Sequence, residues 1–244
     1  MLYNFLQSAP NFTSLLPDVK ICKVNEMATI SNGWYFLTNH WSESYYSYSK
    51  SNSFAEITDT RTEYPKILAN VGSGVSFMKI TGYDDFKRVS GTMISGSTLH
   101  ALCNVLYNQQ FSYQEITEKL YKGNHINVDL WVKDIYGEHT KFDISGDTVA
   151  GSLAKISNSY KNINKEDVFQ SIGFLVAANI SHIAVLTAQL HEVNEIWYTG
   201  NFIQNNKFLM DCLDYGVRFH SADKIRWWFI DKGGFAGAIG TLIN

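Results

Sequence analysis

Three glycine-rich turns constrain the fold of this chain more than any other feature of its sequence. They are VGSGVS at 71–76, SGTMISGST at 90–98 and KGGFAGAIG at 232–240, and each follows a predicted strand or opens a predicted helix. Such a junction directs free backbone N–H groups and the positive end of a helix dipole toward an anion, which suits phosphate. Each turn alone is more simply explained as a tight loop. None matches the P-loop or Rossmann fingerprint, so the turns together favour phosphate binding without naming a ligand.

The segments around these turns predict alternating secondary structure. We expect strands at 66–71, 75–80, 86–89, 195–199 and 225–230, and helices at 26–40, 99–107, 112–121, 164–192, about 201–217 and 235–243. Ser112 and Glu115 have capping-box spacing at the start of one helix, and Asn162 or Asn164 can cap the longest. Because strands with hairpins precede alternating helices and strands, the sequence predicts an α/β fold with a mixed sheet flanked by helices.

Composition narrows the class of protein. Hydrophobic residues make up 45% and charged residues 18% of 244 residues, as in a soluble globular protein. The net charge of −3 predicts no general attraction to nucleic acid or anionic membranes, and no segment is expected to span a membrane. No signal peptide is recognised at the start. The three cysteines are far apart, and neither they nor the seven histidines show metal-ligand spacing, so we expect no metal site and no disulfide framework. A reducing compartment, the cytosol, is the simplest explanation for this use of cysteine.

Two charged residues are candidates for chemistry, although each has a simpler explanation. Arg88 lies directly before the second glycine-rich turn, and its neighbour Lys87 should point to the opposite face of the strand. A solvated pair of charges on an edge strand would explain both. Glu26 begins a predicted helix, where a carboxylate also stabilises the helix dipole. Composition and spacing alone therefore leave Glu26 and Arg88 as structural residues.

Several longer motifs, in order along the chain, resemble the eukaryotic (type II-like) pantothenate kinases. They are YPKILANVGSGVSF (64–77), DDFKRVSGT (84–92), KGNHINVDLWVKDIYG (122–137), NKEDVF (164–169), TGNFIQNN (199–206) and GGFAGAIG (233–240). The resemblance extends from about residue 19 to the C-terminus. It implies an actin-like, ribonuclease H-like kinase fold and transfer of the ATP γ-phosphate to pantothenate, with Mg²⁺, in coenzyme A synthesis.

The resemblance also assigns roles to residues. KVNEM (23–27) places Glu26 at the family's catalytic carboxylate, which would deprotonate the attacking hydroxyl, and FKRVSGT places Arg88 at its active-site arginine. The substrate-binding residues that it implies are Ser73, Ser76, Val149 and Ala150. The nucleotide- and phosphate-binding residues that it implies are Gly72, Gly74, Gly91, Gly96, Thr98, Gly200, Asn201 and Gly234.

Three departures from the family pattern limit what the resemblance implies. The family begins with a lobe that carries a first phosphate loop; here we expect residues 1–63 to be a remnant of that lobe and a connection, and 64–244 to be the C-terminal kinase lobe. Ser95 and Ser97 replace two glycines of the second turn, where a positive φ would be disfavoured. His220 and Asp147 stand where the family has tryptophans around the pantothenate or acyl tail.

The departures leave alternatives open. One is an active pantothenate kinase subunit that a second chain or further residues complete. Another is a non-catalytic regulatory or partner subunit, a pseudokinase, and a third is an inactive fragment. The family forms dimers through its long central helix, here 164–192, so a homo- or hetero-dimer is expected under the first two. An acyl-CoA regulator is a further expectation from the resemblance.

Overall fold

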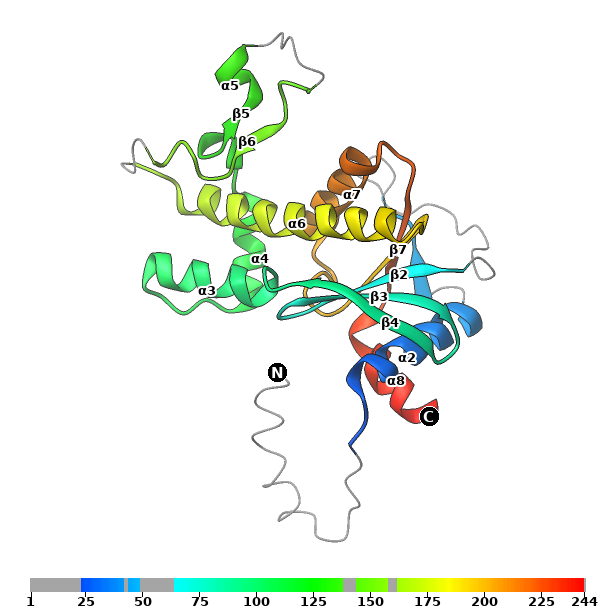
Figure 1. The fold of residues 1–244 in the computed structure, drawn as a ribbon. Helices are drawn as coiled ribbons and strands as arrows, with labels where there is room; N and C mark the ends of the chain where they lie inside the picture. Colours follow the sequence, from blue (N-terminus) through cyan, green and yellow to red (C-terminus); the bar gives the residue numbers. More distant parts are fainter. Residues whose placement is uncertain (1–22, 42–43, 49–63, 138–143, 158–161, 244) are drawn as a thin grey trace, which may run out of the picture.

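The computed structural model describes residues 23–41, 44–48, 64–137, 144–157 and 162–243. Their centre is a six-stranded mixed sheet in the order β1-β8-β7-β2-β3-β4 (Figure 1). The strands are β1 (Tyr45–Tyr46), β2 (Lys66–Val71), β3 (Val75–Gly82), β4 (Asp85–Thr92), β7 (Glu195–Thr199) and β8 (Arg226–Ile230). The class predicted from the sequence, α/β with a mixed sheet flanked by helices, is therefore confirmed.

The strand order identifies the fold more closely. Without the short β1, the sheet read from its β4 edge has the order β4-β3-β2-β7-β8. The first three of these five strands in the chain therefore lie in reverse order, and the last two follow them. The second of them, β3, is antiparallel to its neighbours β2 and β4, whereas β2, β7 and β8 are parallel. This is the arrangement of a ribonuclease H-like, actin-like lobe, as expected.

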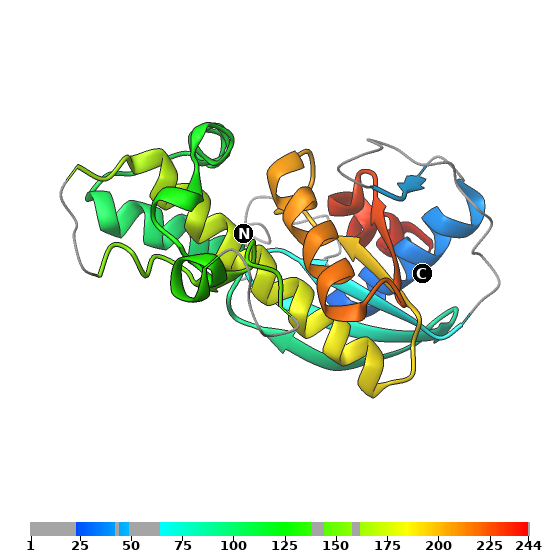
Figure 2. The same ribbon diagram turned by 90° about the horizontal axis from the view of Figure 1, so that it is seen from above.

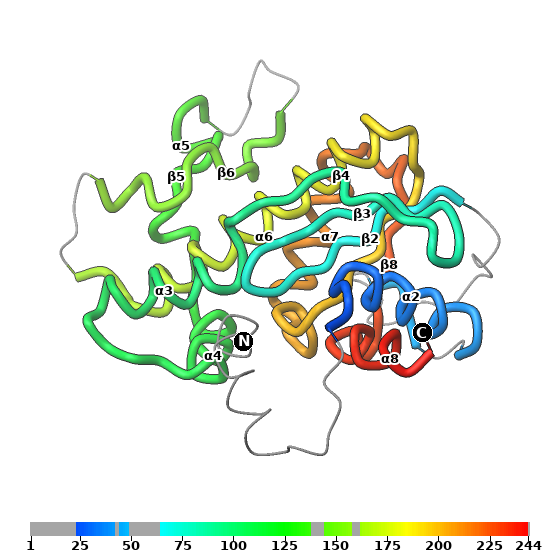
Figure 3. Tube along the Cα trace, turned by 60° about the horizontal axis from the view of Figure 1, so that its bottom comes forward, coloured from blue at the N-terminus to red at the C-terminus, as the bar shows by residue number. Residues whose placement is uncertain are grey.

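Helices cover both faces of the sheet. The long α6 (Lys165–Leu190) and α7 (Lys207–Ser221) lie across one face, as the view from above shows (Figure 2). On the other face α2 (Glu26–His40) packs against α8 (Ala236–Ile243) (Figure 3). The central strands are consequently buried on both sides, which explains why KILANV is apolar almost throughout.

Alternation along the strands divides the core in two. On β2, Ile67 and Ala69 belong to the cluster beneath α6 and α7, and Leu68 belongs to the cluster beneath α2 and α8. On β8, Phe229 faces the first cluster and Trp228 the second. Because successive strand side chains point to opposite faces, one strand supplies both cores.

A smaller group of elements surrounds the N-terminal half of α6. Figure 1 shows α3 and α4 on one side of this helix, and β5, β6 and α5 on the other. The group comprises α3 (Gly96–Tyr107), α4 (Tyr113–Lys122), η2 (His125–Asn127), β5 (Leu130–Trp131), α5 (Val132–Tyr136) and β6 (Val149–Gly151). Asp129 anchors it, since its buried carboxylate accepts hydrogen bonds from Leu153 N at 2.7 Å and from the Ser171 hydroxyl.

Several local predictions are confirmed and some elements were missed. The predicted bounds are confirmed for the helix at 26–40 and for the strands at 66–71 and 195–199. The structure also contains the predicted Ser112–Glu115 capping box and the Asn164 N-cap. The last predicted helix begins instead as the short η3 (Gly233–Phe235). Strands β1, β5 and β6 were not predicted, because two or three residues carry no measurable periodicity.

One prediction needs correction. Contrary to the expectation that no segment reaches the length of a membrane span, α6 is long and apolar enough by length and composition. Most of that stretch is buried inside the protein, as in the core helix of a globular fold. The predicted division between 1–63 and 64–244 falls where residues 49–63 lie outside the described part, and it stays a prediction.

Candidate functional site

The carboxyl ends of three neighbouring parallel strands bring glycine turns together. Gly72 follows β2, Gly200 follows β7, and Gly233 follows β8. The turns are in contact: Phe202 N donates to Val71 O at 3.4 Å, and the Thr199 hydroxyl donates to Gly233 O at 3.0 Å. In open α/β sheets, ligands bind outside the carboxyl ends of the strands where the strand order changes direction. These turns are therefore placed as a ligand site would be.

Glycine is required at the central turn. Gly200 has φ +113°, a conformation that side chains rarely adopt, and a Cβ built there would overlap the Val71 carbonyl. Beside it, a Cβ at Gly234 would overlap the side-chain oxygen of Asn201. The predicted residues Gly200, Asn201 and Gly234 thus form one tight unit in which backbone from β2, β7 and β8 meets.

The second glycine-rich turn is hydrogen-bonded to the first. Gly72 O accepts from Gly96 N at 3.2 Å and from the Ser95 hydroxyl at 2.9 Å. Ser73 O accepts from Ser97 N at 3.3 Å and from the Ser97 hydroxyl at 2.7 Å. Two predicted phosphate-binding segments, far apart in the sequence, therefore form one loop pair.

Ser95 and Ser97, which replace two family glycines, do not need a positive φ in this structure. Ser95 has φ −161°, which any residue adopts, and neither serine is among the residues with positive φ. Their hydroxyls instead bond to the first turn. Thr98 is also engaged locally, since its hydroxyl donates to Met93 O at 3.0 Å and accepts from Ser95 N at 3.3 Å. Thr98 therefore shapes the start of α3 in this structure.

Arg88 lies beside this loop pair. Its Nε donates to the Ser76 hydroxyl at 3.2 Å, and its guanidinium lies across Gly91, where a Cβ would collide with it. Arg88 pairs across the sheet with Met78, which packs beneath α2 and α8, so Arg88 is on the α2 face. It is exposed, and in the described part of the chain Ser76 is the one residue that hydrogen-bonds to its guanidinium.

Lys87 occupies the opposite face, as predicted. Its cross-strand partner is Lys79, whose ammonium donates to His191 O at the end of α6, at 3.3 Å. Directly paired residues of antiparallel strands share a face, so Lys87 is on the α6 side of the sheet. Lys87 and Arg88 are therefore adjacent cations in different environments.

Glu26 stands at the start of α2, on the same face as Arg88. Asn25 caps the helix by accepting from Ala28 N at 3.1 Å. The middle and later parts of α2 contact the β3–β4 turn, at the far end of these strands, through Asn32 with Asp84 and Tyr35 with Tyr83. Glu26 is therefore at the helix end nearer the glycine turns. Its carboxylate makes no hydrogen bond or ion pair with the described residues, and none joins it to Arg88 or Ser76.

A cavity of about 250 Å³ opens beside α6. Val149 and Ala150 of β6 line it, as do residues of α6 and His220 of α7. One of the lining residues, Asn179, accepts from the Thr92 hydroxyl at the end of β4, at 3.2 Å. β4 therefore carries Arg88 on the α2 face of the sheet and Thr92, which pairs with Val75, on the α6 face beside the cavity.

The two departures from the family tryptophans differ in position. His220 lines the cavity, and its ring stacks on that of His182 with centroids 4.0 Å apart and planes 9° apart. Asp147 is exposed, and its carboxylate pairs with Lys133 Nζ at 2.8 Å without lining the cavity. Only the change at 220 therefore alters the cavity wall.

Asn179 and His182 were not predicted as site residues. Both are on α6, whose apolar stripe dominated the sequence signal, and they meet the cavity only because α6 packs against β4 and α7. A polar pair at i and i+3 within an apolar helix was the one available signal. No group of three or more His, Cys, Asp and Glu residues suited to a metal occurs among the described residues.

Comparison with known proteins adds independent evidence. The sequence profile of the family described as Fumble matches residues 7–244. A pantothenate kinase of Schizosaccharomyces pombe is 33% identical over 187 residues, covering 74% of this chain and 46% of that protein. Pantothenate kinase 2 of Arabidopsis thaliana is 31% identical, covering 93% of this chain and 26% of that protein. The 4'-phosphopantetheine phosphatase of Mus musculus is 29% identical, and the match covers 93% of this chain and 28% of that protein.

The chain thus spans between about a quarter and a half of the length of these relatives. Among solved structures, a glucokinase from Balamuthia mandrillaris is 12% identical with a TM-score of 0.46, covering 91% of this chain and 65% of that one. A putative sugar kinase from Cytophaga hutchinsonii is 13% identical with a TM-score of 0.35, and the match covers 96% of this chain and 69% of that one.

Proposed function

This chain belongs to the Fumble family of pantothenate kinase-like proteins, and from that premise we propose that it is a pantothenate kinase. The reaction transfers the γ-phosphate of ATP to the primary hydroxyl of pantothenate and yields 4'-phosphopantothenate. In this proposal the glycine turns hold the phosphates, and the cavity beside α6 holds pantothenate. Cytosolic action in coenzyme A synthesis belongs to the same proposal.

One observation supports the proposal above all others. The turns after β2, β7 and β8 converge at one edge, and the same loop pair carries Arg88 and Ser76 beside it. Backbone N–H groups at such turns suit phosphate oxygens, and an exposed guanidinium suits the charge on a transferred phosphoryl group. The Thr92–Asn179 hydrogen bond connects this edge to an open cavity that could hold the acceptor.

Each residue has a defined task in this scheme. Arg88 neutralises charge that develops on the transferred phosphoryl oxygens, and the Ser76 hydroxyl fixes the direction of its guanidinium. Glu26 accepts the proton of the attacking hydroxyl, since its carboxylate has no partner among the described residues. Positioning dominates phosphoryl transfer, so the tight backbone contacts of the turns matter as much as the charged groups.

The residues present fit Mg²⁺ bound mainly through ATP. Mg²⁺ is usually held by one or two carboxylates together with substrate phosphates, and it keeps several waters. The lack of a three-residue acidic or histidine cluster in the described part of the chain agrees with that mode. When bound, Mg²⁺ would neutralise phosphate charge, and Glu26 is the carboxylate at the start of α2 that could approach its waters.

The first prediction compares adjacent cations on β4. Arg88→Ala should lower kcat/KM for pantothenate phosphorylation by roughly 10²- to 10³-fold, since a donor to the transition state is lost. Lys87→Ala, on the opposite face, should leave kcat/KM within about twofold of wild type, because it removes an exposed surface charge. The measurement is phosphopantothenate formation from ATP, Mg²⁺ and pantothenate. Equal losses in both variants, or none in either, would show that Arg88 has no special role.

A non-catalytic partner subunit is the second candidate. One relative is named as a phosphatase, so this family is not confined to proteins named as kinases. Exposed apolar side chains on α6 and α7, namely Leu186, Tyr215 and Phe219, offer a surface for a homo- or hetero-dimer. Two results together would favour this candidate. The purified chain alone would form no phosphopantothenate, and adding it to a complete pantothenate kinase would change the turnover of that kinase. Acyl-CoA inhibition can be measured in the same mixtures.

A further inference from the structure

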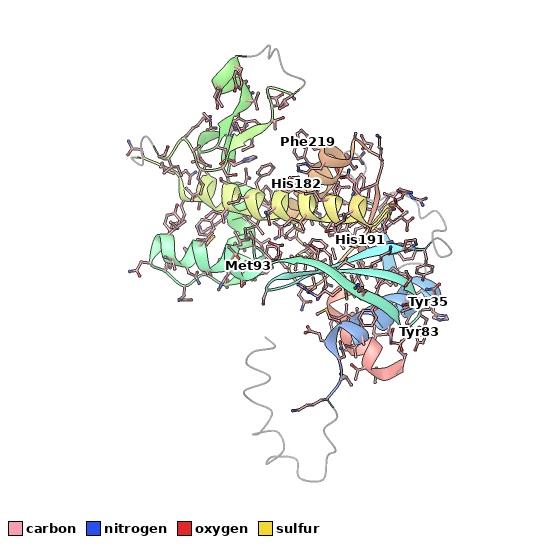
Figure 4. All side chains as sticks on the ribbon, in the orientation of Figure 1. Tyr35, Tyr83, Met93, His182, His191 and Phe219 are labelled. Carbon is pink, nitrogen blue, oxygen red and sulfur yellow. The ribbon has the colours of Figure 1, made fainter. Side chains whose placement is uncertain are left out.

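Two stacked imidazoles form part of the wall of the cavity beside α6. His182 comes from α6 and His220 from α7, and the nearly parallel rings have centroids 4.0 Å apart. Figure 4 shows His182 on α6 where it faces α7, with Phe219 of α7 close by. Neither imidazole makes a hydrogen bond to any residue that the structure describes. Their ring nitrogens are thus available to a ligand in the cavity.

These imidazoles are the only ionisable groups that line the cavity among the described residues. The lining otherwise consists of small, apolar and uncharged polar side chains: Val149, Ala150, Gly151, Ser152, Phe174, Leu175, Ala178 and Asn179. A charged end of a ligand in this cavity would therefore meet the histidine pair or no charge at all.

Charged residues on the neighbouring elements are engaged elsewhere. On α7, Arg218 pairs with Asp214 and Asp223, at 3.1 Å each. Near β6, Asp147 pairs with Lys133 at 2.8 Å, and Lys155 pairs with Asp134 at 2.8 Å. On α6 no Asp, Glu, Lys or Arg occurs between 168 and 190. Among the described residues, no carboxylate therefore occupies the imidazoles as a resident partner.

Resting on the proposed function, we propose that the His182–His220 pair recognises the carboxylate of pantothenate. It would make this chain selective for acceptors that end in a carboxylate over uncharged ones of similar shape, such as pantetheine. The role is one of specificity, distinct from the transfer step assigned to Glu26 and Arg88. His220 replaces the tryptophan expected from the family pattern, and that change supplies a polar, ionisable group at the wall.

The physical chemistry of the pair supports this selectivity. A carboxylate that leaves water needs a donor, and a charged donor forms the stronger hydrogen bond. Burial, and secondly the neighbouring His182, lowers the pKa of His220, so His220 resists protonation when no carboxylate is bound. A carboxylate placed against the rings favours the imidazolium and raises that pKa. Binding of a carboxylate should therefore take up a proton, and affinity should increase as pH falls toward the imidazole range.

Calorimetric titration of the purified full chain tests the proposal without ATP or turnover. Pantothenate should bind roughly tenfold more tightly at about pH 6 than at about pH 8, whereas pantetheine affinity should change little. Titrations in two buffers of different ionisation enthalpy should show proton uptake with pantothenate only. His220→Gln and His182→Gln should each remove the pH dependence and weaken pantothenate binding by roughly tenfold, with pantetheine affected less.

A matched control comes from the same helix. His191 ends α6 well away from His182 in Figure 4, and His191→Gln should bind both compounds as wild type does. Thermal melts establish that each variant is folded. If wild type binds pantothenate with no pH dependence, or the glutamine variants bind it unchanged, the histidine pair has no such role and the proposed function stands. If wild type binds no pantothenate at any pH, both the pair's role and the proposed substrate fail.

Discussion

At the scale of single residues, Ser95 shows how a departure from a family pattern can be absorbed. A serine in place of glycine disfavours a positive φ at this position. In the structure its side chain is fully buried, and its hydroxyl donates to Gly72 O at 2.9 Å. The hydroxyl therefore ties the second glycine-rich turn to the first, and the space that glycine would leave is filled by a bond between them.

This bond makes a prediction. Ser95→Ala should lower the free energy of unfolding by about 1 kcal/mol, the usual net contribution of one hydrogen bond, and should loosen the loop pair. Ser97→Ala should cost less, because Ser97 is exposed and water can replace its hydroxyl. Urea unfolding of the two variants gives both values. A Ser97 variant that is the less stable of the two would contradict the importance assigned to the buried hydroxyl.

At the scale of elements, α2 and α8 cross with their backbones in contact. A Cβ at Gly33 of α2 would overlap the Ala236 carbonyl, and one at Gly240 of α8 would overlap the Thr29 carbonyl. Gly237, on the same helix, has ordinary space: a Cβ there would lie 3.5 Å from Ile30. The crossing thus depends on two of the glycines and not on the third, and it sets the position of α2, which carries Glu26.

The crossing can be tested by a matched pair of variants. Gly33→Ala should destabilise the protein by about 1–3 kcal/mol, as overpacked sites do, because the neighbouring atom is backbone and cannot move aside. Gly237→Ala should be neutral or stabilising by about 0.5–1 kcal/mol, since alanine is the better helix former. Chemical denaturation measures both. Equal effects would mean that the helices separate easily and that α2 is not held in place by this contact.

Some of these elements could be predicted from local sequence patterns, and others could not. Helix 26–40, strands 66–71 and 195–199, and the caps at Ser112 and Asn164 depend on neighbours in the chain, so local patterns sufficed. Strands β1, β5 and β6 exist through pairing with distant segments, and their two or three residues hold no pattern. Asn179 and His182 join the cavity only through the packing of α6, which no local signal encodes.

At the scale of the whole molecule, one topology explains where the site lies. Parallel β2, β7 and β8 end at the same edge, so turns at 72–74, 200–201 and 233–234 meet although well over a hundred residues separate the first from the last. The sequence indicated each turn, and family motifs indicated their common purpose. Their contact, and the continuity from β4 through Asn179 to the cavity, needed the structure.

The central claim is that this edge binds the phosphates of ATP, and amide hydrogen exchange of the full chain tests it most directly. A non-hydrolysable ATP analogue with Mg²⁺ should slow exchange in peptides that contain 72–74, 95–98, 200–201 and 233–234, because a ligand bound at this edge covers the turns and suppresses their local opening. The β3–β4 turn at 82–85, at the opposite end of the strands, should exchange at an unchanged rate. Protection confined to that turn, or no protection at a saturating concentration of the analogue, would contradict the account.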